Sequence, residues 1–225
     1  MIDIVIVANS RDSRLWEMTA NAIKSAVKHA SYPIGNIVTI EQASYAREQK
    51  IGRTLYYDFE FNYNECLNLG RTLCKSQYVA FCNNDLYFER NWARNIVNAM
   101  EAHGYLSASP SSKYVFNGVV EGYDIGKKGQ LLGWCIVTDQ EVFEHIGRFD
   151  TPVQFWYSDN VYGVQLKCAG IKHALIGSSL VRHLGGGSVT LKAIGSLKRA
   201  RYMRAQEEFF IEYKKQKYAI AGIEI

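Results

Sequence analysis

An apolar run that ends in three polar residues is the part of this sequence best suited to chemistry. Residues 78–82 (Tyr-Val-Ala-Phe-Cys) are β-prone, and Asn83, Asn84 and Asp85 follow directly. Such a run predicts a buried strand of a parallel sheet, and open α/β sheets bind ligands just beyond the carboxyl ends of their strands. One carboxylate flanked by amides suits Mg²⁺ or Mn²⁺, which share their coordination shell with water and substrate phosphates. The alternative interpretation is a strand that runs into an ordinary Asn-Asp turn.

Two later clusters also carry reactive side chains. Residues 156–159 (Trp-Tyr-Ser-Asp) bring Asp159 to the start of a predicted helix. A carboxylate there can serve as a general base, or it can simply cap or stabilise the first helical turn. His183 precedes Gly185–Gly187 and Ser188. Glycines allow backbone N–H groups to approach a phosphate, and an imidazole can bind a metal ion. A structural histidine before a glycine-rich turn is the alternative.

The elements that must position these clusters alternate between strand and helix. The first half opens as a βαβ unit, and because crossovers are right-handed, the default is a parallel sheet. Strands are predicted over 2–7, 36–40, 55–61 and 78–82, with helices over 15–30, 64–75 and 92–102. The second half is predicted to hold loops and short strands over 104–133, an apolar segment over 131–138, short helices over 140–146 and 160–169, a strand over 172–176 and a helical tail over 191–217.

Composition indicates a single globular α/β domain. The chain has 225 residues, is 48% hydrophobic and 21% charged, and is long enough for a substantial core. No apolar run reaches transmembrane length, and neither a signal peptide nor a CxxC motif is apparent, so we expect a cytoplasmic protein with reduced thiols. The net charge of +4 is concentrated late in the chain. This basic tail suits either the solvated face of a helix or contact with phosphates or an acidic membrane.

The order of the motifs resembles the inverting family 2 glycosyltransferases, which have the GT-A fold. The similarity covers most of the chain. Residues 81–85 look like the DXD-type motif, 143–150 resemble the Ile-Gly-x-Phe-Asp signature, and Ser158-Asp159 falls at the Glu-Asp pair. His183 with 185–188 resembles the His-x-Gly-Gly-x-Ser element. The helix start at Asn68 and the closing aromatic-lysine helix at 209–214 are also similar. The sequence departs from the family at three positions. The family usually has the shorter Asp in place of Glu41, a more acidic residue in place of Asn83, and Glu in place of Ser158.

This resemblance implies a fold and a set of roles. The fold is a GT-A (Rossmann-like) single domain with a mostly parallel central sheet flanked by helices. Residues 1–103 form the nucleotide-sugar-binding half, 104–190 the acceptor and catalytic half, and 191–225 a helical tail. Asp159 is the expected catalytic base, and Asp85 and His183 the expected ligands of Mn²⁺ or Mg²⁺. Trp134 and Trp156 are expected to bind the acceptor, with core packing as their alternative. The expected donor-binding residues are Ala8, Ser10, Glu41, Asn68, Asn83 and Asn84.

The expected reaction is metal-dependent transfer of a sugar from a nucleotide-sugar donor to an acceptor hydroxyl, with inversion. The acceptor is a glycan, a lipid-linked sugar or a hydroxymethylated base in nucleic acid; the last requires base flipping. A nucleotidyltransferase is a second class, although residues 8–14 lack the glycines of a phosphate loop. A catalytically decayed binding module is the third class, and a retained Asp159 is unnecessary for binding alone.

Overall fold

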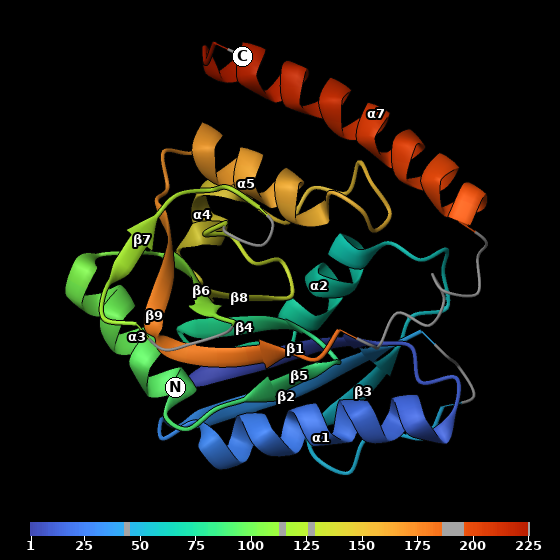
Figure 1. The fold of residues 1–225 in the computed structure, drawn as a ribbon, viewed down its shortest axis with the longest axis vertical. Coiled ribbons are helices and arrows are strands. Elements are labelled where there is room, and N and C mark those ends of the chain that lie inside the picture. Colours follow the sequence, from blue (N-terminus) through green and yellow to red (C-terminus); the bar gives the residue numbers. More distant parts are fainter. Residues whose placement is uncertain (43–45, 113–115, 126–128, 186–195, 225) are drawn as a thin grey trace.

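The fold is a mixed sheet between layers of helices, shown in Figure 1. This computed structural model describes residues 1–42, 46–112, 116–125, 129–185 and 196–224. The strand order is β3-β2-β1-β4-β8-β6-β9-β5, and β7 pairs with β9. The strands are β1 (Ile2–Ala8), β2 (Ile34–Glu41), β3 (Arg53–Tyr56), β4 (Tyr78–Asn83), β5 (Leu86–Phe88), β6 (Ser107–Ser111), β7 (Val119–Glu121), β8 (Cys135–Asp139) and β9 (His173–His183).

The sheet is parallel in its first half only. β3, β2, β1 and β4 pair in parallel, as the βαβ opening predicts. β8 runs antiparallel to β4 and β6, and β9 is parallel to β6 but antiparallel to β5 and β7. The α/β class is therefore confirmed, whereas the expectation of a mostly parallel sheet is corrected to a mixed one. The physical reason is that the segments joining the later strands do not all form the crossover helices that parallel pairing requires.

Alternate side chains of β1 point into two separate cores. Ile2, Ile4 and Ile6 belong to one apolar cluster, and Val5 and Val7 belong to the other. This is the two-residue period of a strand buried on both faces. The first core includes apolar residues of α1 (Ser13–His29) and α3 (Trp92–His103). The second includes residues of α2 (Tyr63–Arg71), α4 (Val142–Ile146) and α5 (Ser158–Cys168).

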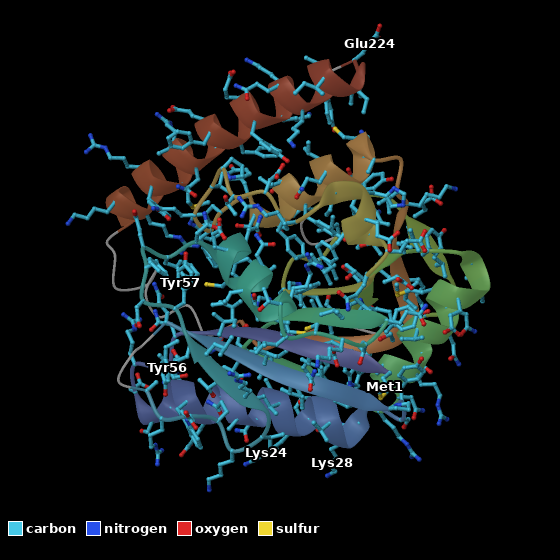
Figure 2. All side chains as sticks on the ribbon, turned by 180° about the vertical axis from the view of Figure 1, so that it is seen from behind. Met1, Lys24, Lys28, Tyr56, Tyr57 and Glu224 are labelled. Atoms are coloured by element: carbon cyan, nitrogen blue, oxygen red, sulfur yellow. The ribbon has the colours of Figure 1, made fainter. Side chains whose placement is uncertain are left out.

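Local sequence signals account for the first helix. Asp12 caps α1 by accepting the backbone N–H of Leu15 at 2.8 Å, which satisfies one of the unpaired donors of the first turn. Ile23 is buried against the sheet, whereas Lys24 and Lys28 lie on the outer side of the helix (Figure 2). The helix is therefore amphipathic, with its apolar stripe on the core.

The last helix, α7 (Ser196–Ala221), lies at the end of the molecule opposite to α1, where it packs on α5 (Figure 1). It matches the predicted helical tail from residue 196 onward, and the predicted residues 191–195 lie outside the described part of the chain.

Two predicted strands have different bounds in the structure. β3 occupies residues 53–56 instead of 55–61, because its partner β2 ends at Glu41, the register partner of Tyr56. β9 continues past the predicted end at Ile176 to His183. The extension exists because β9 leaves β6 and pairs with β5, a long-range pairing that no local pattern reports.

Candidate functional site

The pairing of β5 with β9 brings Asp85 and His183 together, although they lie 98 residues apart in the sequence. Asp85 follows the end of β4, and the next residue, Leu86, is the register partner of His183. The N–H of Leu184 donates to the backbone oxygen of Asp85 at 2.9 Å. His183 Nε2 then lies 3.1 Å from Asp85 Oδ1, and the Asp85 residue is only 5% exposed.

Trp134 and Tyr63 complete the surroundings of this pair. The Trp134 ring stacks on the His183 ring at 5.5 Å between centroids and 17° between planes. Its backbone oxygen accepts the N–H of Asn83 at 2.9 Å. The Tyr63 hydroxyl donates to Asn83 Oδ1 at 2.8 Å. Burial raises the pKa of Tyr63 well above its ordinary value, so the hydroxyl stays protonated and holds the Asn83 amide in one orientation.

Asp159 reaches the site through a tight turn at the start of α5. Tyr157 has φ 67° and ψ 8°, a left-handed conformation that is uncommon for a residue other than glycine. The helix begins at Ser158, so Asp159 is the acid of its first turn. Its Oδ1 accepts the N–H of Asn160 at 3.0 Å. Burial nevertheless raises the pKa of Asp159, and the backbone N–H groups of Asn160 and of Asp159 itself only oppose this effect.

Gly133 packs directly against this carboxylate. A Cβ added at Gly133 would lie 2.4 Å from the Asp159 Cβ and 2.5 Å from Oδ2. Real Cβ atoms essentially never approach other heavy atoms so closely. The position therefore requires glycine for a steric reason, because the Asp159 side chain occupies the space that a side chain at Gly133 would need.

These side chains line one cavity of about 390 Å³. Its wall combines aromatic rings with a few polar groups, which is the usual make-up of a small-molecule site. The lining residues are Tyr63, Asn83, Asp85, Gly133, Trp134, Phe155, Trp156, Tyr157, Ser158, Asp159, His183, Gly185 and Arg199.

Helix α7 braces the loop that carries the aromatic wall. Gln206, 5% exposed, accepts the backbone N–H groups of Gln154 and Phe155 through its Oε1. The Tyr202 hydroxyl donates to Gln154 Oε1 at 2.7 Å. The ring of Tyr157, in the left-handed turn, stacks on Phe210 at 5.4 Å. The strained turn before Asp159 is thus held by tertiary contacts, as such conformations require.

Six of the predicted site residues meet at this cavity, and five lie outside its lining. Those brought together are Asn83, Asp85, Trp134, Trp156, Asp159 and His183, whereas Ala8, Ser10, Glu41, Asn68 and Asn84 are not lining residues. The predicted glycine-rich segment is described only to Gly185, and Gly186, Gly187 and Ser188 lie outside the described residues.

The five outlying residues make contacts with the protein itself. Glu41, 1% exposed, accepts the N–H of Ser10 at 2.8 Å, and Ala8 is 3% exposed. Asn84 donates to Thr19 Oγ1 at 3.0 Å. Asn68 joins α2 to Phe149 by donating to its oxygen and accepting its N–H. Their roles in donor binding remain predictions.

Sequence reasoning missed four residues of the cavity: Tyr63, Gly133, Phe155 and Arg199. Tyr63 and Gly133 gave no signal, because a first-turn tyrosine and a glycine before a tryptophan are common. Arg199 was considered only as part of the basic tail. In the structure Lys198, Arg201 and Arg204 are exposed, as a solvated face predicts, but Arg199 lies over the Trp156 ring at 5.4 Å from its centroid.

The polar pair at the end of β4 is compatible with a divalent cation. Asp85 offers a carboxylate oxygen and His183 an imidazole nitrogen, and their atoms already approach to 3.1 Å. No group of three or more His, Cys, Asp or Glu side chains suited to a metal ion occurs among the described residues. The donor set therefore fits an ion that completes its shell with water and substrate phosphates, as Mg²⁺ and Mn²⁺ do.

The comparison with solved structures finds the same fold in a glycosyltransferase. The structure titled "Crystal structure of GalNAc-T7 with UDP, GalNAc and Mn2+" matches 97% of this chain with a TM-score of 0.64 and 16% sequence identity. The match covers 50% of that protein, so this chain spans about half its length. No protein-family model and no curated protein sequence matches the chain. At this identity the likeness establishes the fold, and the chain has the GT-A architecture of that enzyme.

A search of the described residues for a helix long and apolar enough to cross a membrane finds none.

Proposed function

We propose that this protein is a glycosyltransferase that uses a nucleotide-sugar donor and a divalent cation. The observation that carries the proposal is the meeting of Asp85, His183 and Asp159 in one cavity of about 390 Å³. The shared fold supports it, since GalNAc-T7 was solved with UDP and Mn²⁺. The proposed family is that of the inverting family 2 glycosyltransferases, which the order of the sequence motifs resembles.

The donor would bind at the Asp85–His183 end of the cavity. These two residues would hold Mn²⁺ or Mg²⁺, which supplies positive charge that neutralises the departing diphosphate. Asn83 is fixed by Tyr63 beside them and offers its amide to the donor. Ala8, Ser10 and Glu41, with Asn68 and Asn84, are proposed for the nucleoside part of the site.

Asp159 is the proposed general base. Its carboxylate accepts the proton of the acceptor hydroxyl while the hydroxyl oxygen forms a bond to the anomeric carbon. The bond from that carbon to the diphosphate oxygen breaks on the opposite face, and its electron pair leaves with the nucleoside diphosphate. Because burial raises the pKa of Asp159, the carboxylate is a stronger proton acceptor than an exposed aspartate.

The proposed acceptor is a glycan or a lipid-linked sugar that packs on Trp134 and Trp156. Aromatic faces suit the apolar faces of sugar rings. No finding favours a nucleic-acid acceptor. Residues 1–103 are proposed to supply most donor contacts and 104–190 the base and acceptor contacts.

The proposal is tested by thermal unfolding with UDP-, GDP-, dTDP- and CDP-sugars, each with and without Mn²⁺. A ligand at about 100 times its dissociation constant adds roughly 2.7 kcal/mol of stability. We expect one nucleotide class to stabilise the protein only with metal, and Asp85→Ala to abolish the effect. Asp124→Ala, which removes an exposed carboxylate outside the cavity lining, is the matched control. Stabilisation by no donor, or equal stabilisation of Asp85→Ala, would overturn the proposal.

A further inference from the structure

Among the described residues, the C-terminal helix contributes one permanently charged side chain to the cavity wall. Arg199 is the only lysine or arginine among the described residues that line it. The residue lies in the first turns of α7, and its guanidinium sits 5.4 Å from the centroid of the Trp156 ring. Guanidinium groups stack well on indole faces and keep their N–H donors in a planar fork.

The contact of Arg199 with Trp156 puts its guanidinium beside the segment that carries the proposed base, Asp159, and not beside the proposed metal ligands. Trp156 directly precedes Tyr157, the N-cap of α5, and lies three residues before Asp159 in the first turn of that helix. Asp85, in contrast, contacts His183, which stacks on Trp134. The Trp156 Nε1 donor is also buried without a hydrogen-bond partner among the described residues. A buried donor of this kind is costly unless a ligand or water satisfies it.

The first turns of α7 are held in place by the polar contacts described above. Gln206 and Tyr202 both bind the Gln154 region that precedes Trp156, so the position of Arg199 is set by a docked helix. Lys198, Arg201 and Arg204 are exposed on the same turns. Together they give this end of the helix a positive field that attracts anions towards Arg199.

We infer that the acceptor carries an anionic group, a carboxylate or a phosphate, that Arg199 binds above Trp156. The inference rests on the proposed function and adds a substrate class to it. A neutral sugar needs no guanidinium at this place, whereas a carboxylate or phosphate accepts two parallel N–H bonds from it. Arg199 is thus a specificity-determining residue on the acceptor side of the cavity.

The test compares three acceptor probes that differ in one group: 4-nitrophenyl β-glucoside, its 6-phosphate and the corresponding glucuronide. Binding of each is measured by titration without a donor, and transfer is measured with the stabilising donor and Mn²⁺. In Arg199→Ala we expect binding and kcat/KM for the anionic probes to fall about tenfold or more, as for loss of a charge-assisted contact. The neutral glucoside should change less than about twofold by the same reasoning. Arg199→Lys should recover part of the loss.

Lys215→Ala is the matched control, because it removes an exposed cation of the same helix that lies far along α7 from Arg199 and does not line the cavity. The comparison between the phosphate and the glucuronide identifies which anion is preferred. Wild-type protein that does not distinguish anionic from neutral probes would overturn the inference. An equal loss for all probes in Arg199→Ala would assign the residue a structural role, and weakened donor binding would assign it to the diphosphate; either result overturns it. Donor-free discrimination of the probes without any transfer would instead refute the proposed function and leave the anion site standing.

Discussion

Replacement of Gly133 by alanine is the sharpest test of the geometry around Asp159. The added Cβ would lie 2.4 Å from the Asp159 Cβ and 2.5 Å from Oδ2, whereas ordinary contact begins at 3.4 Å. The aspartate must therefore move by about 1 Å, a misplacement that can reduce a catalytic rate about 10²-fold. Because the three atoms nearest to this Cβ all belong to Asp159, we expect donor binding at Asp85 and His183 to change little.

The assay is the rate of sugar transfer at saturating donor, together with the metal-dependent stabilisation by that donor. We expect Gly133→Ala to lose about 10²-fold in kcat and to keep the donor-induced rise in melting temperature. Gly163→Ala is the matched control on the helix that carries Asp159. The nearest neighbours of its Cβ would be Leu131 at 3.5 Å and Tyr123 at 3.9 Å, which are ordinary contact distances. Alanine favours a helix by up to about 1 kcal/mol over glycine, so this control should be folded and fully active.

A folded Gly133→Ala variant with unchanged kcat would refute the reasoning. It would mean that Asp159 is not the base, or that its position does not limit the reaction. Loss of donor-induced stabilisation in the same variant would show that the damage extends beyond the aspartate.

Three further changes test the site and the fold. Asp159→Asn should lower the transfer rate about 10²–10⁴-fold while the melting temperature at pH 7 stays the same or rises. Burial raises the pKa of Asp159, so the stability that this carboxyl contributes is highest at acid pH and is lost as the pH rises through the folded pKa. A fall in the melting temperature of Asp159→Asn at pH 7 would contradict this. Burial lowers the pKa of His173 to about 3, so its contribution to stability is complete above the unfolded pKa of about 6.5 and is lost as pH falls towards about 3. Denaturant titrations at pH 7 and 5 should reveal roughly 2 kcal/mol of loss from this residue, and an identical pH slope in His173→Gln would refute it. Asp3→Asn should destabilise the protein by about 2–4 kcal/mol, because the buried Asp3 carboxylate accepts hydrogen bonds from the start of β2 and the segment before β4; unchanged denaturant midpoints would be inconsistent with that role.

The sequence alone was sufficient for β1, β2, β4 and the three helices of the first half, and for the edge of the sheet where the site lies, but it misplaced β3 and did not predict β5. The apolar run before Asn83 is a buried strand, and its polar end lies beside the cavity as the rule for open α/β sheets predicts. These features depend on local periodicity and on the abrupt change from apolar to polar residues. Both are properties of neighbouring residues, so a single sequence reports them.

Roles shared between distant segments were less accessible. Asp85 and Asp159 were singled out by their motif order, and both line the cavity, but nothing in the sequence pointed to Gly133 as the residue that leaves room for the Asp159 side chain. Glu41 and Asn68 have motif-like positions and in the structure hydrogen-bond to Ser10 and Phe149, while their roles in donor binding remain predictions. A polar residue after a strand can bind a ligand or a loop, and only its neighbours in space distinguish the two.

The sequence by itself determined the α/β class, the parallel first half of the sheet and the identity of the acidic residues at its carboxyl edge. Tertiary structure alone decided that β9 extends to pair with β5 and sets His183 beside Asp85. It also decided that α7 docks on the loop before α5 and brings Arg199 into the cavity. The physical reason is that strand register and helix docking depend on burial and hydrogen bonding between segments that are far apart in the chain. The residue pattern of either segment alone does not show which segment it will contact.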